Sequence, residues 1–299
     1  MENKPKLGFN NLYDKLIEKG VTFPNHTKEE VIEYLRSISY YYKISSYRKN
    51  FKKNSEGYYE NLTFDALLIT ASIDVYTREL LLDMCLDIEH SVKTSLMTSI
   101  TENESENGYN LINVFKKEYP DKYNDIVTRF RKSSYKRDMF EKRTNISIWV
   151  FLEIIDFGTL NLICQLYFEL YPDVNDSVYS KQLMFIKNIR NTCAHNNVFL
   201  INLFDKRDHI PRPETKTKSY ASNMKINLGL VHYPKINDII NLFYVHKQLC
   251  SKKLNERRYR ESILILDKYS SNVQLFSSST HLQKFFNSIF NKSVDFLIS

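Results

Sequence analysis

Hydrophobic residues recur every three or four positions along most of the chain, a spacing that places them on one face of an α-helix. The pattern is longest at 63–101, which predicts one long helix. It returns between Ile146 and Leu170, where a few charged residues interrupt an apolar run, and predicts a pair of buried helices there. Amphipathic stretches at 236–269 and 282–290 predict further helices. Only six Gly and seven Pro occur in 299 residues, so helix breakers are sparse and the sequence predicts an all-α fold.

The first 60 residues predict a small helical unit. Gly20 is placed to end a first helix, and Thr27 with Glu30 matches a capping box at the start of a second helix. An aromatic and cationic block follows, which suits RNA because rings stack on bases and cations bind phosphates. The alternative is that its tyrosines pack this unit against the next helix. The candidate RNA contacts in this block are Tyr42, Lys43, Tyr47 and Arg48.

A polar loop is expected at 101–110, and the densest run of basic and aromatic residues in the chain follows at 129–143, the basic segment. This composition favours an RNA contact surface, because RNA affinity rests largely on neutralised phosphates. A solvated insertion between core helices is the alternative. The candidate RNA contacts of the basic segment are Arg129, Arg131, Lys132, Lys136, Arg137, Lys142 and Arg143.

Arg190 and His195 lie five positions apart in a polar stretch between two apolar runs. A histidine can carry a proton at neutral pH, and an arginine holds a phosphate with a planar set of donors, so together they suit metal-free RNA cleavage. By chance alone, thirteen Arg and seven His would give about 0.3 pairs at this spacing, so the spacing is weak evidence by itself. Positions five apart lie roughly 140° apart on a regular helix, so the pair needs a local break or a composite site. Asn191 is placed either to position Arg190 or the phosphate, or to end the helix.

Three blocks of the sequence resemble the abortive-infection (Abi) proteins of the AbiD/AbiF type, which belong to the HEPN superfamily of helical ribonucleases and toxins. The string RN-x-CAH at 190–195 and the string W-x-x-x-E-x-x-x-F-G at 149–158 are similar to two family motifs. Tyr41, Tyr42 and Tyr47 are similar to a third motif, in which Ser46 here replaces the usual Gly. The resemblance covers about residues 4–270 and is weakest over 102–145.

The resemblance implies an HEPN-like helical bundle in which Arg190 and His195 are catalytic and two copies form a homodimer around a composite site. It also implies that Glu89 orients the catalytic Arg, although Glu89 is equally well placed to pair with Lys93 four residues later. Glu153 sits among apolar residues, where a carboxylate needs a partner.

In the second block, Trp149 and Phe157 are expected to be core anchors. Gly158 beside them permits tight helix packing or a break.

The function implied by this resemblance is that of a metal-independent endoribonuclease toxin of bacterial phage defence, which would leave a 2′,3′-cyclic phosphate and need no cofactor. The alternative is an RNA-binding protein that forms a complex with a structured non-coding RNA without cleaving it.

Charge and cysteine content add limits to this picture. The chain has 42 basic and 35 acidic side chains, a net charge of +7, which suits nucleic acid without requiring it. Its four cysteines are scattered without a C-x-x-C pair, which favours reduced core thiols over disulfides or a metal site. We expect neither a signal peptide nor a membrane span, and hence a cytoplasmic protein. The expected organisation is an N-terminal unit at 1–60, a core at 61–205 and a C-terminal extension at 206–299.

Overall fold

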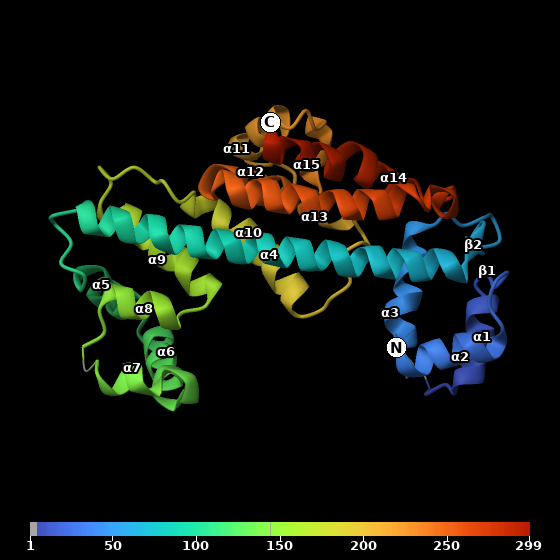
Figure 1. The fold of residues 1–299 in the computed structure, drawn as a ribbon, viewed down its shortest axis with the longest axis horizontal. Coiled ribbons are helices and arrows are strands. Elements are labelled where there is room, and N and C mark those ends of the chain that lie inside the picture. Colours follow the sequence, from blue (N-terminus) through green and yellow to red (C-terminus); the bar gives the residue numbers. More distant parts are fainter. Residues whose placement is uncertain (1–4, 144) are drawn as a thin grey trace.

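The computed structural model describes residues 5–143 and 145–299, and helices make up nearly all of their regular structure (Figure 1). One helix, α4 (Phe64–Glu102), runs along the whole length of the molecule, and the other helices pack along it or beside its ends. The strands found in these residues, β1 (Val21–Thr22) and β2 (Leu62–Thr63), have two residues each and pair in parallel. The predicted all-α fold is therefore confirmed.

Helix α4 forms where the sequence predicts its longest helix. Thr63 caps its N-terminus, because the Thr63 hydroxyl accepts a hydrogen bond from the Ala66 N–H at 3.1 Å. Buried side chains occur on more than one side of its 39 residues, because several helices pack along it. Those helices are α10 (Leu183–Ala194), α12 (Pro234–Leu249) and α13 (Lys252–Ser270).

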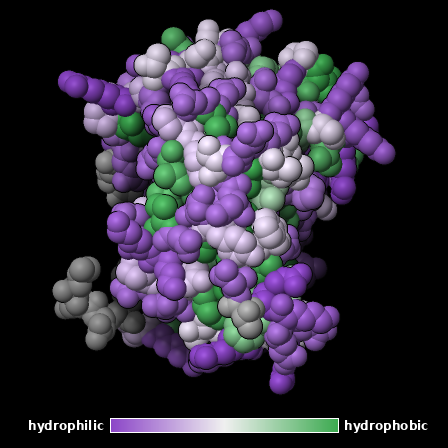
Figure 2. All heavy atoms as spheres, turned by 90° about the vertical axis from the view of Figure 1, so that its left-hand side faces the viewer, coloured by the Kyte–Doolittle hydropathy of each residue, from purple (hydrophilic) through white to green (hydrophobic). Residues whose placement is uncertain are grey.

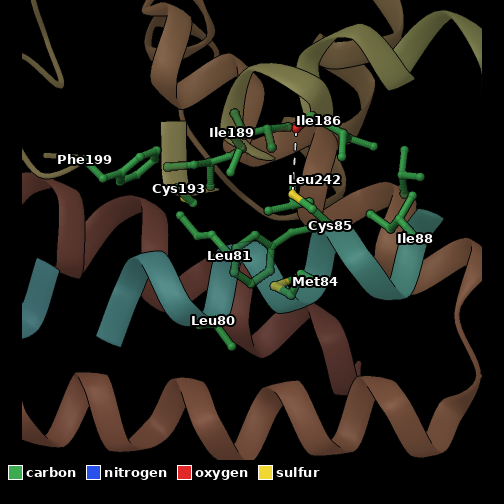
Figure 3. Packing of buried hydrophobic residues seen from close by; sticks show 14 of the residues in the cluster. Leu80, Leu81, Met84, Cys85, Ile88, Ile186, Ile189, Cys193, Phe199 and Leu242 are labelled. Carbon is green, nitrogen blue, oxygen red and sulfur yellow. Dashed lines mark hydrogen bonds between the residues drawn. The ribbon is translucent and has the colours of Figure 1, made fainter. Parts of the chain in front are cut away.

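The contact between α4 and α10 forms the centre of the hydrophobic core. Figure 3 shows Leu81 and Cys85 of α4 pointing toward Ile186 and Ile189 of α10. The Cys85 thiol lies 3.7 Å from the carbonyl oxygen of Ile186. All of these side chains are at most 2% exposed, so α10 is held firmly on the long helix.

Within residues 5–63, three α-helices precede α4: α1 (Phe9–Ile17), α2 (Lys28–Ser37) and α3 (Tyr41–Ser46). The predicted capping box is present, with the Thr27 hydroxyl 3.2 Å from the Glu30 N–H and the Glu30 carboxylate 2.8 Å from the Thr27 N–H. Pairing of β1 with β2 ties these helices to the start of α4, a contact that the hydrophobic pattern did not predict. Residues 1–4 of the expected N-terminal unit lie outside the described residues.

The segment between α4 and α10 folds into further α-helices of 5 to 14 residues. The predicted polar loop is confirmed between α4 and α5, and the predicted pair of buried helices is confirmed as α8 and α9. The bounds are α5 (Asn110–Glu118), α6 (Pro120–Lys132), α7 (Arg137–Glu141), α8 (Ile148–Ile154) and α9 (Phe157–Leu170).

The expectation that Trp149 is a core anchor is wrong. Trp149 is 47% exposed, because α8 turns Ile148 and Phe151 into the core and Trp149 outward. Its ring lies against Gly108, where a Cβ atom would clash with it. Phe157 is 2% exposed and is a core residue, as expected.

The C-terminal helices lie over α4 and α10 (Figure 1). The predicted amphipathic stretch at 236–269 consists of two helices, α12 and α13, because the chain is extended at Cys250 and Ser251. Helix α11 (Thr215–Asn223) precedes α12. After α13 come α14 (Thr280–Phe285) and α15 (Asn291–Ile298), which are joined by a π-helical turn.

Buried apolar side chains from all three expected segments belong to one continuous cluster. All four cysteines are buried and free of disulfides. Within the described residues, no helix has an apolar stretch long enough to cross a membrane.

A buried charge network joins α4 to α12 and α13. The guanidinium of Arg258, which is 4% exposed, donates to Asp87 at 2.6 Å and to Asp83 at 2.9 Å. The imidazole of His246, completely buried, lies between Asp87 at 3.2 Å and Asn255 at 2.8 Å. Burial lowers the pKa of His246, but its bonds to Asp87 and to other oxygen and sulfur partners outweigh burial and raise the pKa to about 9.

The raised pKa of His246 predicts a loss of stability at alkaline pH. Because the folded pKa lies above the ordinary value of 6.5, the stabilisation is complete below pH 6.5 and is lost as the pH rises to about 9. We expect a loss of roughly 3 kcal/mol in the free energy of unfolding across this window. Urea unfolding at several pH values measures it.

The matched control is His246→Gln, which keeps a polar side chain but cannot titrate. The difference in unfolding free energy between wild type and variant should shrink from pH 6.5 to 9. Parallel pH curves for the two proteins would contradict a charged His246 in the folded state.

Candidate active site

Arg190 and His195 lie at the C-terminal end of α10. Arg190 lies one turn before the end of α10 at Ala194, and His195 follows as the C-cap with φ −85° and ψ 10°. The His195 N–H still donates to the Asn191 carbonyl oxygen at 3.1 Å, as in a regular helix. Asn196 then adopts a left-handed conformation with φ 54°. The helix is therefore regular between the two residues and breaks only after His195, so the expected local break does not lie between them; the alternative of a composite site stays a prediction.

Arg190 faces a cavity of about 330 Å³ between α6, α9 and α10. Its Nε atom is buried and has no hydrogen-bond partner among the residues that the structure describes. An unpaired buried donor is costly, so this guanidinium edge is poised to bind an acceptor. The cavity is lined by Lys122, Asp156, Phe157, Gly158, Asn161, Leu162, Lys187, Arg190 and Asn191.

His195 is exposed and follows directly on this helix turn. The residue after it, Asn196, is held by two cations. The Asn196 side-chain oxygen accepts hydrogen bonds from Lys43 at 2.9 Å and from Arg78, and the Lys43 ammonium also lies 3.3 Å from the Asn196 carbonyl oxygen. Burial is the main reason why the pKa of Lys43 is lowered, and the nearby Arg78 adds to it.

The buried carboxylate of Asp74 organises this region from α4. It is completely buried and accepts hydrogen bonds from Arg78 Nε at 2.9 Å and from the Tyr47 hydroxyl at 2.9 Å. It also accepts from the N–H groups of Phe199 at 2.9 Å and Leu200 at 2.6 Å. One carboxylate therefore fixes the backbone shortly after His195 and the arginine that holds Asn196.

Lys235 of α12 holds the same turn from the other side. Its ammonium donates to the carbonyl oxygens of Phe199 at 2.7 Å and Ile201 at 2.6 Å. Burial lowers the pKa of Lys235 to about 8. The segment after His195 is thus clamped by side chains from α3, α4 and α12.

The hydrophobic pattern and the motifs did not identify Asp74, Arg78 or Lys235. A sequence signal for the first two existed: an Asp and an Arg four residues apart, within the apolar stretch of α4. A polar pair at the helical spacing inside a buried face needs partners within the core.

The structure shows the surroundings of the three residues that were predicted to support the site. Glu89 forms an ion pair with Lys93 at 3.0 Å, and no ion pair joins Glu89 to Arg190 in the described part of the chain. Asn191 lines the cavity beside Arg190, and its backbone oxygen accepts the His195 N–H at 3.1 Å. Glu153 is exposed, so the expectation that it sits among apolar residues and needs a partner is wrong.

Of the N-terminal RNA candidates, Tyr42 is 79% exposed and Lys43 reaches Asn196. Tyr47 is completely buried and bonded to Asp74, so it cannot stack on a base in this structure and instead packs the N-terminal helices on α4. Arg48 is half-buried, with its guanidinium over the Tyr59 ring at 5.8 Å. For Tyr47 the structure therefore confirms the alternative to an RNA contact, namely packing of the N-terminal unit against the next helix.

The basic segment lies on α6, α7 and the turns beside them, at one end of the molecule (Figure 1). Phe130 and Phe140 pack on each other at 5.2 Å, which leaves Tyr135, 98% exposed, as its freely accessible ring. Figure 2 views this end and shows mostly hydrophilic side chains with small hydrophobic areas between them. The basic candidates are exposed at Arg129, Arg131, Lys132, Arg137, Lys142 and Arg143 and half-buried at Lys136.

These observations define an all-α protein with a polar site at the end of a buried helix. The family model of the Abi-like proteins matches residues 33–200, which is more than half of the chain, and the chain therefore belongs to this family. The matched range runs from α2 to the turn that follows His195. Comparisons with curated proteins and with solved structures found no match.

Proposed function

We propose that the protein is a metal-independent endoribonuclease of a bacterial phage-defence system, with Arg190 and His195 in an HEPN-type site. The observation that carries this proposal is the geometry at the end of α10. A buried, unpaired Arg190 Nε faces a cavity, and an exposed His195 follows at the C-cap. Membership of the Abi-like family supports the link to abortive infection.

In the proposed reaction, the 2′-hydroxyl of a ribose attacks the adjacent phosphorus and the bond to the 5′-oxygen breaks. His195 takes the proton of the 2′-hydroxyl or gives a proton to the leaving oxygen. Arg190 stabilises the charge that develops on the phosphate. The products are a 2′,3′-cyclic phosphate and a 5′-hydroxyl, which makes RNA and not DNA the substrate.

One histidine fills one of these two proton roles at a time. We propose that a second copy of the chain supplies the other, in a homodimer around a composite site. The exposed position of His195 supports this, because a buried histidine could not reach a partner's active site.

The test is to incubate the purified protein with total cellular RNA in excess EDTA and to map the new ends. Cleavage that leaves cyclic phosphate ends is the expected result, because neither group of the proposed site needs a metal. The same treatment of a single-stranded DNA is the control, and it should leave the DNA intact.

The second candidate function is RNA binding without cleavage, which the exposed cations of the basic segment and the exposed Tyr135 favour. A protein that leaves RNA intact in EDTA but purifies with one discrete RNA would support this function. A protein that neither cuts RNA nor carries it would contradict both functions.

A further inference from the structure

The cavity beside Arg190 has walls from three helices far apart in the sequence. Lys122 comes from α6, Gly158 from the first turn of α9, and Lys187 and Arg190 from α10. Its volume of about 330 Å³ is large enough for a phosphate group with part of a nucleotide. Polar and charged groups from separate elements thus converge on one hollow.

The charge in this cavity is unbalanced. Three cations, Lys122, Lys187 and Arg190, line it together with one carboxylate, Asp156. That carboxylate is already engaged, because it caps α9 by accepting from the Thr159 N–H at 2.8 Å and the Thr159 hydroxyl at 3.0 Å. The excess of positive charge in the cavity favours the binding of an anionic ligand.

The pKa of Asp156 is consistent with this engagement. Burial raises it, but the two bonds from Thr159 and the nearby charges of Lys122 and Arg129 outweigh burial and lower the pKa below its ordinary value. The carboxylate therefore stays ionised and bound to the helix end, and its one negative charge offsets only part of the charge of the three cations.

Gly158 allows Lys187 to reach the first turn of α9. A Cβ atom at position 158 would lie 3.2 Å from both Cε and Nζ of Lys187, so any larger residue would push the ammonium away. The first N–H groups of a helix lack partners within the helix and favour negative charge. The Lys187 ammonium, the N-terminus of α9 and the unpaired Nε of Arg190 therefore lie around the same cavity.

We propose that this cavity is a phosphate subsite that holds an RNA phosphodiester next to the bond that is cut. The proposal rests on the proposed ribonuclease function, and it assigns Lys122 and Lys187 to substrate binding. Arg129 of the basic segment reaches the rim, with its guanidinium 4.0 Å from Asp156. The RNA strand would therefore run from α6 into this cavity and onto Arg190.

The test measures the affinity for a labelled single-stranded RNA in a His195→Ala background, where no cleavage interferes. Adding Lys122→Gln and Lys187→Gln should weaken binding by about tenfold at near-physiological salt. The slope of log affinity against log salt should fall in magnitude by about 0.7 for the phosphate contact that is lost.

The matched control removes the same charge elsewhere, with Lys252→Gln and Lys253→Gln at the exposed start of α13. A second variant, Gly158→Glu, places a carboxylate in the cavity at a position where an acid suits the helix. It should keep the thermal stability of the protein and weaken RNA binding.

Binding by the Lys122/Lys187 variant that equals binding by the Lys252/Lys253 control would overturn the subsite. If the wild type fails to cut RNA but the cavity variants still bind RNA more weakly than the control, the subsite stands and the ribonuclease function fails. A wild type without measurable affinity for RNA would overturn both.

Discussion

Replacing His195 with alanine should lower the rate of RNA cleavage by roughly 10²–10⁴-fold, the usual contribution of a general acid or base. His195 is exposed, and its N–H donates to the Asn191 carbonyl oxygen at 3.1 Å. The substitution therefore removes a proton carrier and leaves the core untouched. Single-turnover cleavage of a labelled RNA in EDTA measures the rate, and thermal unfolding confirms that the fold is intact.

The matched control is His209→Ala, because His209 is also exposed and stacks on His232 at 4.8 Å, outside the proposed site. This variant should cut RNA at the wild-type rate. Arg190→Lys keeps the charge but loses the planar fork of donors, so it should also cut slowly. Equal rates for wild type and His195→Ala would remove His195 from the mechanism.

Replacing Asp74 with asparagine should destabilise the protein by about 3–5 kcal/mol, the usual cost of removing one partner of a buried ion pair. The variant leaves the guanidinium of Arg78, which is 7% exposed, without its carboxylate. It also replaces an oxygen by an NH₂ group near the N–H donors of Phe199 and Leu200. Urea unfolding measures the loss.

The control is Asp14→Asn, which removes an exposed carboxylate 3.8 Å from Lys28. Exposed ion pairs contribute little, so this variant should lose no more than about 1 kcal/mol. If Asp74→Asn lowered the free energy of unfolding by no more than Asp14→Asn does, the Asp74 network would not hold the turn after His195. At temperatures where Asp74→Asn remains folded, we expect slower RNA cleavage, because the turn positions His195.

The spacing of hydrophobic residues was sufficient to predict much of the secondary structure. It predicted the bounds of α4 to within one residue at each end, because the helical spacing of hydrophobic residues repeats along all 39 residues of this helix. The capping box at Thr27 and Glu30 was also readable, since both partners lie three residues apart. Arg190 and His195 were chosen from side-chain chemistry and a family resemblance, and the break expected between them lies instead after His195.

The tertiary structure decided which face of each element meets which partner. Trp149 is half-exposed although its sequence block suggests a core residue, and Tyr47 is buried, which is the packing alternative that its block left open. Neighbouring helices cover Tyr47 and do not cover Trp149. A periodic pattern says which residues share a face, but not how much of that face a neighbour covers.

The surroundings of the candidate site depend on contacts between residues far apart in the chain. Asp74 lies 125 positions before Phe199, and Lys43 lies 153 positions before Asn196. Likewise, the cavity beside Arg190 exists only where α6, α9 and α10 meet. The sequence by itself determined the helices and the two residues proposed for chemistry. Only the packing of the helices decided what holds those residues in place and which charges surround them, because local spacing carries no record of long-range contacts.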